Sequence, residues 1–86
     1  MGNIHTSGED YLETILVLWN KQNGEVRSID VARELNVTKP SVSNAMKILR
    51  EGKFITMDEN GFITLTDAGR YVAEKIYEKH LVLTEW

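Results

Sequence analysis

The chain has 86 residues, the size of one small domain, and a chain this short buries only about 60% of its unfolded surface. Hydrophobic residues make up 42% of the sequence, the net charge is −3 and there is no cysteine, which excludes a disordered chain, a disulfide framework and thiolate metal sites. No signal peptide or long apolar run occurs, so we expect a soluble, cytoplasmic protein without a membrane partner.

The first predicted helix begins after Ser7, a candidate N-cap, and ends near Lys21. Asp10 and Glu13 are spaced i and i+3, so both carboxylates point to one face of this helix. That face is nearly opposite the apolar face. The apolar face consists of Tyr11, Leu12, Ile15, Leu16 and Trp19.

Two shorter helices follow. Ser28 can cap a helix of about nine residues, and residues 36–38 leave room only for a tight turn into a helix over 40–51. Gly52 is expected to end that helix in a left-handed conformation. One face of the helix over 40–51 is an apolar stripe of Val42, Ala45, Met46 and Leu49. The pair is typical of a helix-turn-helix, although a plain helical hairpin in a bundle could have the same lengths.

Positive charge is concentrated in this region. Residues 38–53 carry four basic side chains against Glu51 alone, a local charge of +3, so the rest of the chain carries −6. An acidic body with one basic helix can dock on phosphate in one orientation. We therefore predict that the polar side of the helix over 40–51 lies in the major groove of DNA.

A β-hairpin is predicted next, with strands over 54–58 and 62–65 around Glu59-Asn60-Gly61. Asn-Gly favours a type I′ turn, which needs positive φ at both central residues. A hairpin directly after a recognition helix is a wing, and we expect the acidic tip formed by Asp58 and Glu59 to avoid phosphate. Thr66 can then cap a last helix that runs to the end of the chain.

Asp10, Glu13 and His80, which lies far along the last helix, could form a partial site for a divalent metal such as manganese or ferrous iron. A simpler interpretation is that acids in a first turn complement the helix dipole. The histidine would then be a hydrogen-bonded core residue. The spacing alone does not place His80 near the first helix.

Four segments resemble the N-terminal half of the metal-dependent repressors typified by the diphtheria toxin repressor and the manganese transport regulator. They are GEDYLETI, TKPSVSNAMKILREG, ITLTDAGR and the KH near the end. The resemblance implies a mainly α winged helix-turn-helix with a small β-hairpin over 7–65. It implies that 66–86 form a long helix leading into a dimerisation domain that this chain lacks. It also implies a homodimer on a double-stranded DNA operator.

The resemblance also implies roles for the candidate metal ligands. In the manganese branch of the family the first helix supplies an Asp and a Glu, matched by Asp10 and Glu13, and the long helix supplies a His, matched by His80. The iron branch has Met at the position of Asp10. Thr84 stands where some members have a further glutamate, and the other ligands lie on a later helix. The site for Mn²⁺ or Fe²⁺ is therefore expected to be incomplete in this chain.

The operator-facing positions follow from the same resemblance. Hydroxyl groups and backbone N–H groups at a helix start can bond phosphate, and an asparagine can pair with adenine. Plain N-terminal capping is an alternative role for Thr38 and Ser41. The matching positions are Thr38, Pro40, Ser41, Ser43 and Asn44, to which the basic Lys39 and Lys47 are added.

The function predicted from the sequence is metal-dependent transcriptional repression by a dimer. One alternative is a winged-helix regulator that does not sense metal, and another is a winged helix used for protein–protein contact. An enzyme is not expected, because the sequence shows no nucleophile–base pair, phosphate-binding loop or complete metal site.

Overall fold

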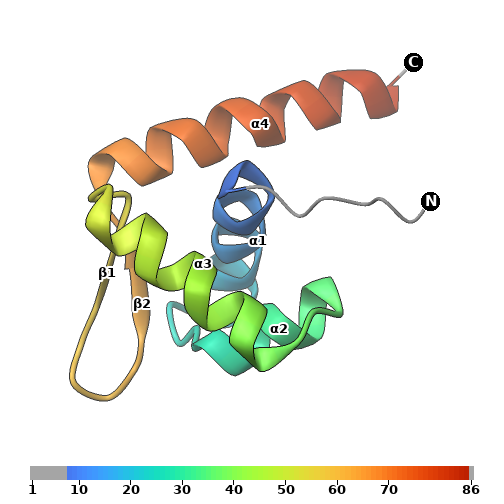
Figure 1. Ribbon diagram of the computed structural model, residues 1–86. Helices are drawn as coiled ribbons and strands as arrows, with labels where there is room; N and C mark the ends of the chain where they lie inside the picture. Colours follow the sequence, from blue (N-terminus) through green and yellow to red (C-terminus); the bar gives the residue numbers. More distant parts are fainter. Residues whose placement is uncertain (1–7, 86) are drawn as a thin grey trace.

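A computed structural model describes the backbone of residues 8–85 and the side chains of residues 8–79. These residues form three helices, a two-stranded antiparallel hairpin and a final long helix (Figure 1). In chain order the elements are α1 (Gly8–Lys21), α2 (Ser28–Leu35), α3 (Lys39–Glu51), β1 (Ile55–Met57), β2 (Ile63–Leu65) and α4 (Asp67–Glu85). The predicted winged helix-turn-helix is confirmed.

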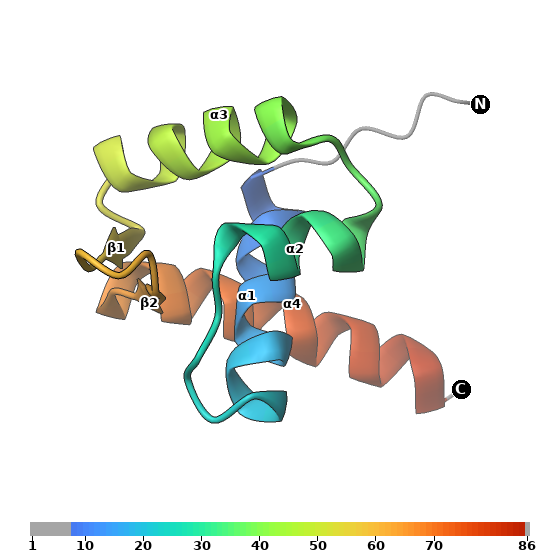
Figure 2. The ribbon, with the colours of Figure 1, turned by 90° about the horizontal axis from the view of Figure 1, so that it is seen from below.

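Helix α1 lies at the centre of the fold. α4 packs across it on one side, and the pair formed by α2 and α3 packs on another (Figures 1 and 2). Every element contributes to one hydrophobic core, in which Ile15, Val31 and Ile63 are completely buried. Among the described side chains no polar or charged residue is buried. No helix in the described part of the chain is long and apolar enough to cross a membrane.

The predicted apolar stripe of α3 is confirmed, since Val42, Met46 and Leu49 are buried. The predicted end of this helix is wrong in one respect. Gly52 has φ −80° and is right-handed, whereas Lys53 is left-handed with φ 65°. A Cβ at Gly52 would lie 3.0 Å from two ring carbons of Phe54, so a larger residue here would require the Phe54 ring to shift.

The predicted cap of α2 is also corrected. The N-cap is Arg27 and Ser28 is the first helical residue. The Asp30 carboxylate accepts a hydrogen bond of 3.0 Å from the backbone N–H of Arg27, which satisfies one donor at the helix start. The tight turn to α3 is as predicted, with Asn36 in the left-handed conformation at φ 57°.

The wing hairpin forms with shorter strands than expected and pairs Met57 with Ile63. The predicted type I′ turn is wrong, because at the tip only Gly61 has positive φ. One oxygen of the Asp58 carboxylate instead accepts hydrogen bonds from the N–H groups of Asn60 and Phe62, both at 2.9 Å. This side-chain acceptor organises the tip without a second left-handed residue.

Candidate nucleic-acid interface and metal-binding carboxylates

The outward face of α3 is polar and basic. All seven side chains predicted to face DNA are exposed. They extend from the N-cap of α3 as far as Lys47, while the exposed Glu51 is the last residue of the helix. The positions are Thr38, Lys39, Pro40, Ser41, Ser43, Asn44 and Lys47.

The start of α3 is held by Thr38. Its hydroxyl oxygen accepts a hydrogen bond of 3.3 Å from the Ser41 N–H, and its hydroxyl donates to the Ser41 side-chain oxygen at 2.9 Å. Pro40 occupies the first turn, where a missing N–H costs nothing. The capping role considered for Thr38 is therefore confirmed, and its exposed position leaves it accessible to a ligand as well.

We expect Thr38→Ala to lower the free energy of unfolding by about 1 kcal/mol, because the first turn of α3 loses its side-chain acceptor. Urea denaturation measures the change. Thr38→Ser keeps the hydroxyl and is the matched control, so an equal loss in both variants would contradict the capping role.

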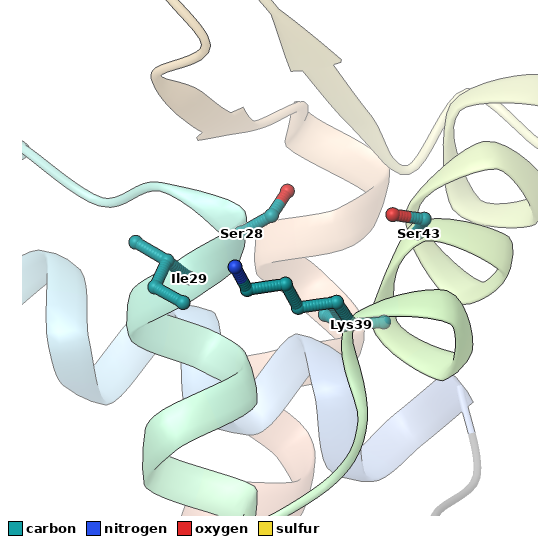
Figure 3. Close-up of a pocket in the computed structure, with 5 residues that line it drawn as sticks. Ser28, Ile29, Lys39 and Ser43 are labelled. Carbon is teal, nitrogen blue, oxygen red and sulfur yellow. The ribbon is translucent and has the colours of Figure 1, made fainter.

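A cleft of about 310 Å³ opens where the start of α3 meets the start of α2. It is lined by Ser28, Ile29, Lys39, Val42 and Ser43. Figure 3 shows the Lys39 side chain reaching from α3 towards α2, with the hydroxyl groups of Ser28 on α2 and Ser43 on α3 both above it in this view. The cleft therefore combines one ammonium group and two hydroxyl groups with the apolar side chains of Ile29 and Val42.

Arg27 is a candidate binding residue that the sequence reasoning missed. It directly precedes the Ser28 of the cleft, it is exposed, and its guanidinium carbon lies 4.4 Å from the centre of the Phe62 ring in the wing. The Ile63 N–H donates to the Val26 carbonyl at 2.8 Å, so the end of β2 nearest the wing tip is attached to the same segment. Only this tertiary contact distinguishes Arg27 from an ordinary surface arginine.

Asp10 and Glu13 lie on α1 and are each partly buried. Burial in the hydrophobic core raises the pKa of the neighbouring Tyr11 phenol. Within the described side chains no group of three or more His, Cys, Asp or Glu residues could hold a metal ion. His80 is on α4, but its side chain lies outside the described residues, so its place in a site stays a prediction.

Comparison with known proteins decides the family. Residues 3–62 match the N-terminal DNA-binding domain of the iron-dependent repressors, which is well over half of the chain. The chain belongs to the iron-dependent repressor family. Its members are DNA-binding transcriptional regulators and not enzymes, in agreement with the sequence analysis.

Two relatives illustrate the match. An HTH-type transcriptional regulator of Methanocaldococcus jannaschii is 33% identical over 72 residues, covering 84% of this chain and 58% of that protein. The transcriptional regulator MntR of Salmonella typhimurium is 32% identical over 77 residues, covering 87% of this chain and 47% of that protein. The chain therefore spans about half the length of these relatives.

Solved structures agree with the fold. ScaR with bound zinc is similar with a TM-score of 0.71 and 27% identity, over 86% of this chain and 34% of that one. The DNA complex of Staphylococcus aureus MepR is similar with a TM-score of 0.67 and 25% identity, over 88% of this chain and 58% of that one. Both likenesses support the winged helix-turn-helix.

Proposed function

We propose that this chain carries the DNA-binding domain of a cytoplasmic, metal-dependent transcriptional repressor that acts as a homodimer on a two-fold operator. The observation that supports this most directly is the exposed polar and basic face of α3, in a chain that belongs to the iron-dependent repressors. The similar structure of MepR was solved as a complex with DNA, which also supports the proposal.

In this proposal α3 enters the major groove with its N-terminal end first. Lys39 lies at that end, together with the hydroxyl groups of Thr38 and Ser41. Asn44 stands in the second turn, at a depth where its amide can bond an adenine edge. Lys39 in the cleft and Arg27 beside it would bond phosphates of the flanking backbone.

We expect Asn44→Ala to weaken specific operator binding by about 1–3 kcal/mol and to relax base preference at one position in each half-site. Lys47→Ala is expected to weaken all sequences about equally and to reduce the salt slope by about one unit, because its ammonium would meet a phosphate. Titration of both variants with operator and random DNA at several salt concentrations checks this. Equal losses on both DNAs for both variants would show that the base-reading face is wrongly assigned.

The metal proposal rests on Asp10 and Glu13, two carboxylates on one face of α1 that are partly withdrawn from water. Carboxylate oxygens suit Mn²⁺ and Fe²⁺, and the carboxylate at position 10 favours manganese over iron within the family resemblance. His80 is the proposed third ligand. A bound divalent cation would offset the negative charge of the two carboxylates and hold together the elements that carry its ligands.

A winged-helix regulator that does not sense metal is the second candidate, because within the described side chains no group of three or more His, Cys, Asp or Glu residues could hold a metal ion. Equilibrium binding of Mn²⁺ and Fe²⁺ separates the two. A winged helix used for protein contact would show no steep dependence of DNA affinity on salt, whereas phosphate contacts produce one.

A further inference from the structure

The start of α4 is hydrogen-bonded to Lys53 and Phe54, the two residues that follow the C-cap of α3. The Thr66 hydroxyl donates a hydrogen bond of 2.7 Å to the Lys53 carbonyl, and the Thr66 N–H donates one of 3.0 Å to the Phe54 carbonyl. Gly69 packs directly on that second carbonyl, since a Cβ at Gly69 would lie 2.0 Å from the Phe54 oxygen. Backbone therefore meets backbone here, with no room for a side chain between them.

The same two residues are also bonded to α3. The Lys53 N–H donates to the Arg50 carbonyl at 3.0 Å and the Phe54 N–H donates to the Leu49 carbonyl at 2.9 Å. Lys53 has φ 65°, a conformation unfavourable for a residue with a Cβ, so the surrounding bonds must hold it. Residues 53–54 are thus fixed to α3 on one side and to α4 on the other.

Thr66 does more than cap α4. Its hydroxyl oxygen accepts a hydrogen bond of 3.1 Å from the Gly69 N–H, as an N-cap does. The same hydroxyl donates its hydrogen to the Lys53 carbonyl, just after the end of α3. One hydroxyl therefore satisfies the first turn of α4 and bonds the end of α3 at the same time.

We infer that Thr66 and Gly69 are positioning residues that fix the direction of α4 relative to α3 and thereby set the distance between the two recognition helices of the dimer. The inference rests on the proposed function, because this distance matters only if two half-sites are read together. In Figure 1, α4 begins beside α3 and the wing and runs across α1 to the other side of the domain. The direction of α4 therefore determines where its far end lies relative to α3.

We call the contact of Thr66 and Gly69 with residues 53–54 the α3–α4 joint. Because α4 is long, a small rotation at this joint moves the far end of α4 by a large distance. At 1.5 Å per residue its 19 residues extend about 28 Å, so a rotation of about 10° at the joint moves the far end by about 5 Å. That displacement exceeds the rise of one base pair, about 3.4 Å. A flexible joint would therefore make the distance between the two α3 helices of the dimer variable, and the protein would distinguish poorly between half-sites at different spacings.

The geometry of the joint is tested first, without DNA. This chain has no cysteine, so spin labels on Lys47→Cys and Glu78→Cys, both at exposed positions, report the distance between α3 and α4. We expect one narrow distance in the otherwise unaltered chain and a shifted or broadened one in Thr66→Val and Gly69→Ala. Thr66→Ser keeps the hydroxyl and should restore the narrow distance. Gly61→Ala is the control for a glycine replacement away from this contact, because Gly61 lies at the wing tip with open space around it; its φ of 85° adds a backbone strain that Gly69, which has no positive φ, does not carry.

The role of the joint in recognition is tested on DNA selected by the protein from a random pool. Affinity is compared for half-sites at the selected spacing and at one base pair more or less. We expect Thr66→Val and Gly69→Ala to reduce this preference by about threefold or more, and Thr66→Ser and Gly61→Ala to keep it, because simultaneous engagement depends on geometry. A purely structural role would lower stability without changing the preference.

An unchanged label distance or an unchanged spacing preference in folded Thr66→Val overturns the inference, and this variant decides the matter if Gly69→Ala does not fold. If the wild-type protein selects no sequence at all, the proposed function fails, and the role of the joint in half-site spacing fails with it. In that case the label distances still show whether Thr66 and Gly69 hold α4.

Discussion

Leu49→Ala is expected to lower the free energy of unfolding by about 2–5 kcal/mol, the usual cost of truncating a core leucine. Leu49 is only 5% exposed and packs beside the start of α1, where it lies 3.7 Å from the position of a Cβ on Gly8. Alanine would leave a cavity between the recognition helix and the central helix. Domains of this kind have only about 5–15 kcal/mol of stability, so the variant loses a large share of it.

The adjacent residue supplies the control. Ile48 is on the same helix but is 57% exposed, so Ile48→Ala should change the free energy of unfolding by no more than about 0.5 kcal/mol. Urea denaturation of both variants measures the difference. Near wild-type stability of Leu49→Ala, or an equal loss in both, would mean that the apolar stripe of α3 is not the buried face.

The parts of the fold that could be predicted from the sequence are those set by local spacing. The stripe that contains Leu49, the N-cap at Thr38 and the N-cap at Thr66 depend on side chains within four residues of each other, and all are confirmed. A helical period or a cap pattern is visible in a single segment, and the tertiary structure here agrees with it.

The predictions that failed involve groups far apart in the sequence, or competition between local groups. Arg27 replaces Ser28 as the N-cap in a segment that stacks on Phe62 and hydrogen-bonds the wing. At the wing tip the Asp58 carboxylate supplies acceptors that make a second left-handed residue unnecessary. Lys53 takes the left-handed position, and its carbonyl accepts a hydrogen bond from Thr66 at the start of α4, a contact that the sequence around Gly52 does not reveal.

In the candidate site, too, some features follow from local sequence spacing and others depend on tertiary packing. That Asp10 and Glu13 share a face of α1 follows from helical spacing, and so does the exposure of the polar face of α3. The cleft between α2 and α3 and the placement of Arg27 depend on how the helices and the wing pack, so they could be found only from the structure.

In the protein of natural length, Mn²⁺ is expected to raise operator affinity and Asp10→Ala to abolish that increase. Couplings between two binding sites are typically about 1–3 kcal/mol, or about 5–150-fold in affinity, and the increase should fall in this range. Asp10 is the partly buried carboxylate that shares a face with Glu13, on the helix that packs across α4. Removing it takes away one of the two proposed oxygen donors on α1, and the remaining groups would hold the metal weakly.

Glu9→Ala is the matched control. Glu9 is the neighbouring acid in the first turn of α1, and it is fully on the exposed side. Its removal takes away the same charge and a similar helix-dipole contribution of about 0.3–1 kcal/mol, so Glu9→Ala controls for these two general effects of losing an acid from the first turn. DNA titrations with and without Mn²⁺ measure the effect, and metal titrations with and without operator must give the same coupling factor, because linkage is reciprocal. Retained stimulation in Asp10→Ala, or its loss in Glu9→Ala, would remove Asp10 from the metal site and leave the metal-independent regulator as the better account.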